Sequence, residues 1–426
     1  MNLELPRGMR DIESDEASKI EYIRQKFIET SNLFGFQFME SSPIELLSVI
    51  ETKSGPSIKN EIYYFKDKGD RDVALRFDFT IGLTRYAVSQ KSMKLPAKLA
   101  AFGGVWRYDE PQKGRYRFFH QWDVEIYGQP NLESDAEIIE FTSKFLSNLQ
   151  LRNIVINVCD RELVESYLHK VFKSNSAELT GDILRAVDKI QKKKKHEIIK
   201  EYEQKGYSSS DLDKILEFSL IRGSPEEIEK KFEVKQLKNW DKLCELFNSL
   251  KNRQVNNVRI NFGIVRGLDY YSGIVFEAFD SNSDLGALVG GGRYDTLTKA
   301  FGRPNIGATG VAGGVERIAF SLDKQGIVIE KKSPHVWVAF VNDELQKIAL
   351  NIVSHLRQKG IRAETDLSGK PLKKQMEMAS NSRFAIIVAP KEYSSKNVVV
   401  RNMEDGTEKQ IDLESLLSNP QSNLQF

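Results

Sequence analysis

The chain has 426 residues, of which 40% are hydrophobic and 29% are charged, so we expect two or three domains with substantial hydrophobic cores. Its 62 basic and 60 acidic residues leave a net charge of +2, which excludes a generally polyanion-binding protein and requires any RNA contact to come from a local patch. Two cysteines, five scattered histidines and the lack of a long apolar run give no basis for a disulfide framework, a zinc site or a membrane span, so we expect a cytoplasmic protein without a structural metal.

The first 160 residues combine helical and alternating patterns. Apolar residues from Ile20 to Ile28 fall on one face of a helix whose other face is charged. The elements expected in order are a helix over 15–34, an extended stretch over 36–40 that ends before Pro43, antiparallel strands over 61–128 interrupted by a helix at about 82–90, a helix over 133–149 and a strand over 153–159.

A basic hairpin is the most informative part of this region. Residues 101–127 are predicted to form two strands joined by a charged loop that turns at Pro111 and Gly114. Its basic side chains are Arg107, Lys113, Arg115 and Arg117. Guanidinium groups on facing strands are suited to hold phosphate or carboxylate oxygens bidentately. A solvated basic hairpin is the alternative, but the aromatic and amide residues at 118–121 favour a lined pocket.

Residues 161–255 are predicted to be helical and highly charged. At their centre, Lys192 to Lys195 form a run of four lysines. Such a run indicates either a solvated helix face or a patch for RNA phosphates, and the sequence favours neither.

Strand character returns after the helical segment. Strands are expected over 258–262, 270–279 and 285–289, followed by Gly290–Asp295, a helix over about 313–324 and a linker over 324–333. Beyond the linker we expect a strand over 335–341, a helix over 343–358, a strand over 361–365, a helix over 370–380, a strand over 384–389 and a hairpin over 397–413. The chain is therefore predicted to contain a β-rich catalytic body, a helical insertion and a C-terminal α/β module.

Phosphate binding cannot be assigned to a common nucleotide motif. The sequence lacks G-x-x-x-x-G-K-[ST], and Gly290–Arg293 does not match G-x-G-x-x-G. Arginines beside glycine or aromatic residues are the remaining candidates, namely Arg107, Arg266 and Arg317. Each alone is typical of a surface ion pair, whereas together they indicate a site for an anionic ligand.

Several segments resemble the motifs of class II aminoacyl-tRNA synthetases. Arg107–Glu125 resembles motif 2, Gly307–Arg317 resembles motif 3, and a helix through Pro43 resembles motif 1. The string Arg266–Tyr271 resembles the histidine signature of the histidyl-tRNA synthetase family, and Gly291–Asp295 and Leu5–Asp11 are similar to that family as well.

This resemblance implies an α+β fold. It predicts a class II antiparallel-sheet catalytic domain over 1–325, with the helical insertion at about 165–255, and a C-terminal α/β anticodon-binding domain over 333–426. It also implies ATP-dependent activation of L-histidine, transfer to the 3′ end of tRNA(His), and a homodimer formed through motif 1. Mg²⁺ is expected to accompany ATP, and no protein side chain is assigned to a metal.

The resemblance also implies roles for individual residues. The implied catalytic residues are Arg107, which would hold the α-phosphate and the histidine carboxylate, and Arg266, a second fixed cation. The implied ATP-binding residues are Arg107, Asp109, Arg115, Phe119 and Arg317, with Phe119 and Arg317 on the two faces of adenine. The implied histidine-binding residues are Asp78, Thr80 and Gln121 for the ammonium group, and Glu125, Tyr270 and Tyr271 for the imidazole.

Two other functions fit parts of the pattern. One is a non-catalytic, histidyl-synthetase-like regulatory subunit of ATP phosphoribosyltransferase, but the resemblance implies that such paralogues lack the C-terminal domain and lose the Arg266–Tyr271 signature. The other is a class II synthetase of different specificity, against which Glu125 and the paired tyrosines argue. The chain departs from the family pattern at Glu110, at Trp122–Asp123 and at Ser272–Ile274.

Overall fold

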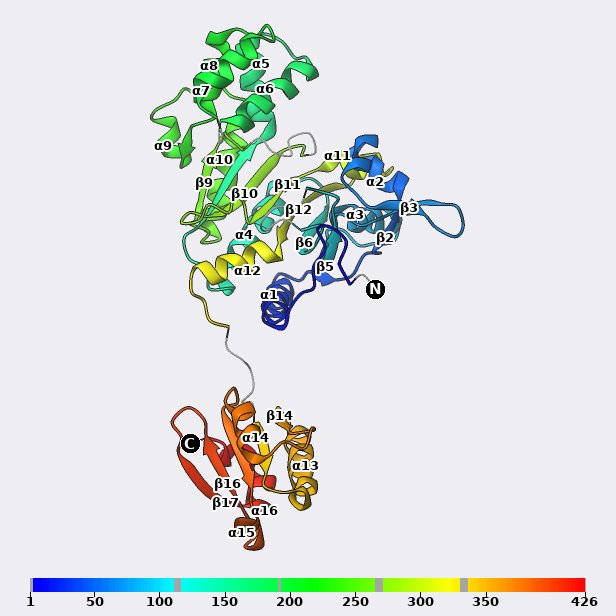
Figure 1. The fold of residues 1–426 in the computed structure, drawn as a ribbon. Coiled ribbons are helices and arrows are strands. Elements are labelled where there is room, and N and C mark those ends of the chain that lie inside the picture. Colours follow the sequence, from blue (N-terminus) through cyan, green and yellow to red (C-terminus); the bar gives the residue numbers. More distant parts are fainter. Residues whose placement is uncertain (1–2, 111–115, 191–192, 265–270, 330–335, 426) are drawn as a thin grey trace. The chain divides into compact units, whose positions relative to one another are not determined.

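The computed structural model describes residues 3–110, 116–190, 193–264, 271–329 and 336–425 (Figure 1). The chain divides into two compact units, Met1–Val328 and Ile329–Phe426, each with its own hydrophobic core. Every helix among the described residues is too short or too polar to cross a bilayer.

The larger unit is built on a nine-stranded mixed sheet. From one edge to the other its strands are β1 (Gln37–Phe38), β5 (Ala97–Trp106), β6 (Phe118–Gly128), β12 (Gly307–Gly314), β11 (Val289–Arg293), β10 (Ile274–Asp280), β7 (Ile154–Asp160), β9 (Val258–Asn261) and β8 (Arg222–Gly223). All pairings from β5 to β7 are antiparallel, whereas β1–β5 and β7–β9 are parallel. The expected antiparallel sheet thus forms the centre, and parallel pairs lie toward its edges.

One face of this sheet is covered by α1 (Ser14–Leu33), α4 (Leu132–Asn148) and α12 (Val315–Lys324). The rings of Phe27 in α1 and Phe145 in α4 lie 5.5 and 4.9 Å from that of Trp122 in β6, and all three side chains are fully buried. Trp122, Val124 and Ile126 enter this core. Because side chains alternate along a strand, the odd-numbered residues of β6 face the opposite side.

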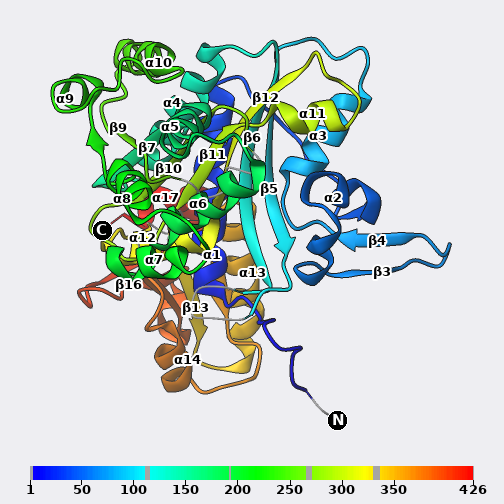
Figure 2. The same ribbon diagram turned by 90° about the horizontal axis from the view of Figure 1, so that it is seen from above.

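A second layer lies beside β5 and β6 on that opposite side (Figure 2). It contains β2 (Ile44–Leu46), α2 (Leu47–Ser54), the 3₁₀ helix η1 (Pro56–Asn60), β3 (Tyr64–Lys66), β4 (Asp72–Leu75), α3 (Thr80–Ser89) and α11 (Asp295–Ala300). The strands pair in the order β2–β4–β3. Phe79 and Leu83 share a buried cluster with Leu99 of β5, which places the start of α3 against the main sheet.

Two local expectations are wrong. No helix runs through Pro43 in the described structure, because Pro43 lies between the end of α1 and the short strand β2. The strand expected at 285–289 instead lies at Val289–Arg293, so the three glycines form the strand rather than follow it. Glycines carry no hydrophobic pattern, and this strand is specified by its pairing with β10 and β12.

The helical insertion follows β7 (Figure 1). It consists of α5 (Arg161–Phe172), α6 (Ala177–Lys189), α7 (Lys195–Glu203), α8 (Ser209–Phe218), α9 (Pro225–Glu229) and α10 (Trp240–Asn252). Side chains cap several N-termini: Asp160 accepts from Leu163 N, and Ser224 and Glu227 form a reciprocal capping box at α9.

The smaller unit is an α/β module with a five-stranded sheet in the order β14–β13–β15–β16–β17. Its elements are β13 (Val336–Phe340), α13 (Asp343–Gln358), β14 (Ala363–Thr365), α14 (Leu372–Ala379), β15 (Phe384–Val388), α15 (Pro390–Ser394), β16 (Asn397–Asn402), β17 (Glu408–Asp412), α16 (Leu413–Ser418) and α17 (Pro420–Asn423). β13 pairs in parallel with β14 and β15, and β16–β17 is an antiparallel hairpin. The predicted C-terminal α/β architecture is confirmed.

Candidate functional site

The odd-numbered face of β6 carries a buried acidic group, Glu125, whose side chain is 1% exposed. The hydroxyl of Tyr294 donates a hydrogen bond to Glu125 Oε2. On the neighbouring strand β12, Gly310 makes room for this carboxylate, because a Cβ atom built there would overlap Glu125 Oε2 and lie 2.7 Å from Val124 O. The Tyr294 hydroxyl therefore holds the carboxylate in the space that Gly310 leaves open.

A second buried carboxylate, Asp123, connects two of the predicted site residues. Gln121 Nε2 donates to Asp123 Oδ1 at 2.7 Å, and Thr80 Oγ1 donates to Asp123 Oδ2 at 3.2 Å. Asp78 lies two residues before Thr80, the first residue of α3, and accepts from Ile81 N at 3.1 Å. The segment before α3 and the strand β6 therefore bring Asp78, Thr80 and Gln121 to one place, as predicted.

Tyr271 also belongs to this group. Burial raises the pKa of its hydroxyl, and the nearby charges of Glu125 and Glu277 raise it further, so the hydroxyl remains a hydrogen-bond donor at neutral pH. The ring lies beside Gly292 of β11, where an added Cβ would be 2.9 Å from Tyr271 Cδ1. Tyr271 and Glu125 thus offer a donor and an acceptor in one buried region, which is what a ring with two nitrogens requires.

Arg107 links this buried region to a neighbouring cavity. Its Nε donates to Phe77 O at 3.0 Å, and its Nη2 donates to Gln121 Oε1 at 3.2 Å. Its guanidinium carbon lies 5.1 Å from the centre of the Phe119 ring. These contacts fix the orientation of the guanidinium group.

The cavity has a volume of about 430 Å³ and is bordered by β6, β10, β12 and the start of α12. Its lining includes Arg107, Asp109, Tyr116, Phe119, Gln121, Glu277, residues 285–290, residues 312–314, Glu316 and Arg317. The structure therefore places five predicted residues, Arg107, Asp109, Phe119, Gln121 and Arg317, around one cavity.

The start of α12 is fixed to β6 on one side of the cavity. The Glu316 carboxylate accepts from the main-chain N of His120 at 2.9 and 3.0 Å and lies 3.0 Å from His120 Nδ1. The next residue, Arg317, donates from Nη1 to Ala287 O at 2.8 Å. Arg317 and Phe119 are therefore held on separate elements that border the same space.

Some predicted residues lie outside this arrangement or outside the described residues. Arg115, Arg266, Tyr270 and Lys192 fall in the segments that the structure does not describe. The basic residue Arg117 donates to the main-chain oxygens of Asp109 and Arg7, which gives it a structural role in the hairpin.

The lysine run contains ion-paired residues. Lys193 lies 3.0 Å from Glu201, and Lys195 lies 2.6 Å from Asp213 and 3.0 Å from Glu217. Nearby carboxylates neutralise these two charges locally, which favours the solvated helix face over the RNA patch.

Sequence reasoning missed Asp123, Glu316 and Tyr294 as parts of the site. Asp123 is marked only by its place between Gln121 and Glu125 on the same face of a strand. Glu316 and Tyr294 lie within segments that resemble the family motifs. The residues that they contact, His120 and Glu125, are far away in the sequence. Among the described residues, no group of three or more His, Cys, Asp or Glu side chains is arranged to hold a metal ion.

Comparison with known proteins gives one family for most of the chain. Residues 8–318 match the family model described as Histidyl-tRNA synthetase, and residues 335–422 match the one described as Anticodon binding domain. A relative from Pyrococcus furiosus, named histidine–tRNA ligase, is 33% identical over 97% of this chain and 98% of its own length.

Two solved structures share the fold. A histidyl-tRNA synthetase from Nostoc superposes with a TM-score of 0.84 at 23% identity, covering 99% of this chain and all of that one (100%). A protein from Bacillus halodurans, described as an ATP phosphoribosyltransferase regulatory subunit/histidyl-tRNA synthetase, gives 0.76 at 21% identity, covering 91% and 99%. These structural similarities establish the fold. The activity is inferred from the site and from the relatives of higher sequence identity.

Proposed function

The chain belongs to the histidyl-tRNA synthetase family, and from this premise we infer that it is a histidine–tRNA ligase. The observation that carries this inference is the match along nearly the whole chain to a histidine–tRNA ligase at 33% identity, including the C-terminal domain. The reaction has two steps. The histidine carboxylate attacks the α-phosphorus of ATP and releases diphosphate, and a hydroxyl of the terminal tRNA ribose then attacks the histidyl carbonyl and releases AMP.

The first step brings two anions together, so we assign the charge stabilisation to arginines. Arg107 would bind the α-phosphate and the carboxylate, since its guanidinium is oriented by Phe77 and Gln121 at the border between the cavity and the buried group. Arg266, identified from the sequence signature, would supply a second positive charge to the same phosphate. Oriented cations of this kind stabilise the charge that develops on the phosphoryl oxygens.

ATP would occupy the cavity of about 430 Å³. Phe119 and Arg317 border this space from β6 and α12, and a ring face and a guanidinium plane are suitable stacking partners for adenine. Asp109 would accept a hydrogen bond from the adenine amino group, and Arg115 would contact the distal phosphates.

Histidine would bind in the buried region beside Arg107. Asp78, Thr80 and Gln121 would accept from the ammonium group, since Asp123 brings two of them together. Glu125 and Tyr271 would contact the two imidazole nitrogens, with Tyr270 shaping the pocket. An apolar side chain in this position would leave a buried carboxylate and a hydroxyl without partners, which is the physical basis of selectivity.

Mg²⁺ would enter with ATP. Glu277 is the carboxylate on β10 that lines the cavity, and Mg²⁺ in nucleotide sites is commonly bound by one or two carboxylates together with phosphates and waters. The donor chemistry therefore fits a phosphate-bound ion, which would neutralise part of the charge of the leaving diphosphate.

We also propose a homodimer through the segment that resembles motif 1. On β2 the side chains of Ile44 and Leu46 are 44% and 47% exposed, and Phe65 on β3, which the strand register places on the same face of the small sheet, is 43% exposed. Large apolar side chains gathered on one small sheet are typical of a protein interface. Light scattering should give twice the chain mass of 48.6 kDa, and a mass of 48.6 kDa would contradict the dimer.

The second candidate is the regulatory role named for the Bacillus halodurans protein. It differs from the ligase in one decisive respect, because a regulatory subunit does not charge tRNA. We expect the purified protein, given ATP and Mg²⁺, to attach labelled L-histidine to tRNA(His). Failure to charge that tRNA with any amino acid would overturn the ligase and favour the regulatory protein.

A further inference from the structure

The main chain at Tyr271 is held from two directions. From the first turn of α5, Arg161 Nη1 donates to Tyr271 O, and Arg161 N donates to Gly273 O at 2.9 Å. From the other direction, Ser272 N donates to Arg293 O at 2.7 Å. The residue that we assign to the imidazole is thus bonded both to the helical insertion and to the end of β11.

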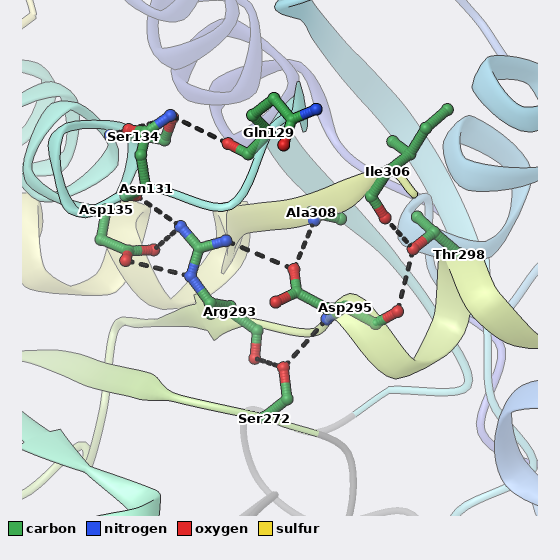
Figure 3. Close-up of polar contacts among 10 residues, drawn as sticks. All are labelled: Gln129, Asn131, Ser134, Asp135, Ser272, Arg293, Asp295, Thr298, Ile306 and Ala308. Atoms are coloured by element: carbon green, nitrogen blue, oxygen red, sulfur yellow. Dashed lines mark hydrogen bonds and ion pairs between the residues drawn. The ribbon is translucent and has the colours of Figure 1, made fainter. Parts of the chain in front are cut away.

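The Ser272 side chain adds a further bond on the β11 side (Figure 3). Its hydroxyl accepts from Asp295 N at 3.0 Å. The Asp295 carboxylate in turn accepts from Ala308 N at 2.8 Å and from Arg293 Nη1 at 3.3 Å. Ser272 is therefore joined to α11 directly and to β12 through Asp295.

Arg293, at the end of β11, is itself held by several bonds of its guanidinium group (Figure 3). Its guanidinium group contacts Asp135 through Nε at 3.1 Å and through Nη2 at 2.9 Å, and it donates to Asn131 O at 2.7 Å. Its side chain is 11% exposed, so these bonds form largely away from solvent. A buried arginine with several bonds holds its own main chain, and Arg293 O is the acceptor for Ser272 N.

On the side of the helical insertion, the bond to Tyr271 O depends on the orientation of the Arg161 guanidinium group. Its Nε donates to Glu165 at 2.7 Å one turn along α5, which orients the guanidinium group so that Nη1 reaches Tyr271 O. Arg161 is the first residue of the helical insertion. The insertion therefore contributes a bond to the histidine pocket through a main-chain oxygen.

The surrounding residues leave little room for Tyr271 to move. Its ring lies beside Gly292, which has a φ of 158° and no space for a Cβ, and its hydroxyl is buried near Glu125. A shift of the Tyr271 main chain would move the hydroxyl relative to that carboxylate. Misplacement of about 1 Å in a binding constellation is enough to lower its efficiency strongly.

We propose that Arg161 and Ser272 are positioning residues that set the place of Tyr271 and thereby the affinity for histidine. This proposal rests on the assignment of Tyr271 to the imidazole. Neither residue is assigned a contact with the substrate. Arg161 acts on the main-chain oxygens of Tyr271 and Gly273, and Ser272 acts on the main chain directly after Tyr271. Ser272 belongs to the segment in which the sequence departs from the family pattern, and the structure gives that departure a role in this chain.

The test measures histidine-dependent exchange of diphosphate into ATP, with KM determined separately for histidine and for ATP. A lost neutral hydrogen bond corresponds to a severalfold change and a lost charged one to about tenfold or more. We therefore expect Ser272→Ala to raise the KM for histidine about three- to tenfold and Arg161→Ala at least tenfold. The KM for ATP should change less than twofold in both, and Arg161→Lys should recover part of the loss.

Two reference variants make the result decisive. Arg185→Ala removes a guanidinium paired with Asp182 elsewhere in the insertion and should leave both KM values unchanged. Tyr271→Phe should raise the KM for histidine if the assignment of Tyr271 is correct, and an unchanged value would overturn that assignment. If Tyr271→Phe raises the KM while Arg161→Ala and Ser272→Ala do not, the positioning proposal is wrong and the proposed function stands. Equal changes in the two KM values would likewise contradict positioning.

Discussion

The close approach of Gly310 to Glu125 gives a sharp prediction for the variant Gly310→Ala. The new Cβ would overlap Glu125 Oε2 and lie 2.7 Å from Val124 O, so the carboxylate must move away from β12. The displaced carboxylate would lose its proposed hydrogen bond with the imidazole, and a hydrogen bond to a charged group contributes about 1.5–3 kcal/mol. Because 1.4 kcal/mol corresponds to a factor of ten, the KM for histidine should rise about 10- to 100-fold.

Diphosphate exchange at varied histidine and ATP concentrations measures this effect, and urea unfolding measures the accompanying loss of stability. Overpacking of a buried site costs about 1–3 kcal/mol, so the variant should still fold but with a free energy of unfolding that is lower by about this amount. Gly181→Ala is the matched control, because a Cβ there would meet only ordinary contacts of 3.6 Å and 3.9 Å with the Arg185 side chain. The reasoning is refuted if Gly310→Ala binds histidine as the unmodified protein does, or if the KM for ATP rises equally.

Four further outcomes are expected. Arg266→Ala should lower the exchange rate about 100-fold or more, since removal of a preorganised charge stabiliser costs about 2.7–4 kcal/mol; a rate near that of the unmodified enzyme would contradict its role. Asp123→Asn should weaken histidine binding about tenfold in calorimetry, because it removes a charged acceptor, and unchanged affinity would exclude it from the pocket. Phe119→Ala should raise the KM for ATP severalfold and leave that for histidine unchanged, whereas the reverse pattern would remove Phe119 from the adenine site. Charge reversal at Lys193 and Lys195 should leave the KM for tRNA within about twofold, and a large rise would restore the RNA patch.

Short-range patterns predicted much of the fold. The amphipathic spacing from Ile20 to Phe27 predicted α1, and the alternation of strands and helices after residue 335 predicted the C-terminal module. The glycine-rich strand β11 was misplaced because glycine has no side chain to show a period. Its position depends on pairing with strands on both sides.

Residue types within matched segments predicted where site residues gather. Arg107, Phe119 and Gln121 were expected together, and they line one cavity. Asp123 was noted only as unusual, because its role depends on Thr80, 43 positions earlier in the chain. The contact of Arg161 with Tyr271 spans 110 positions and could not be read from either segment alone. Such contacts are set by the folding of the whole sheet and leave no local periodicity.

The most direct test of the whole account is diphosphate exchange by the unmodified protein with each of the 20 amino acids in turn. The site described on β6 predicts rapid exchange with L-histidine and exchange near background with all the others, because the imidazole ring offers a donor to Glu125 and an acceptor to Tyr271. Exchange with a different amino acid, or with none, would contradict the account.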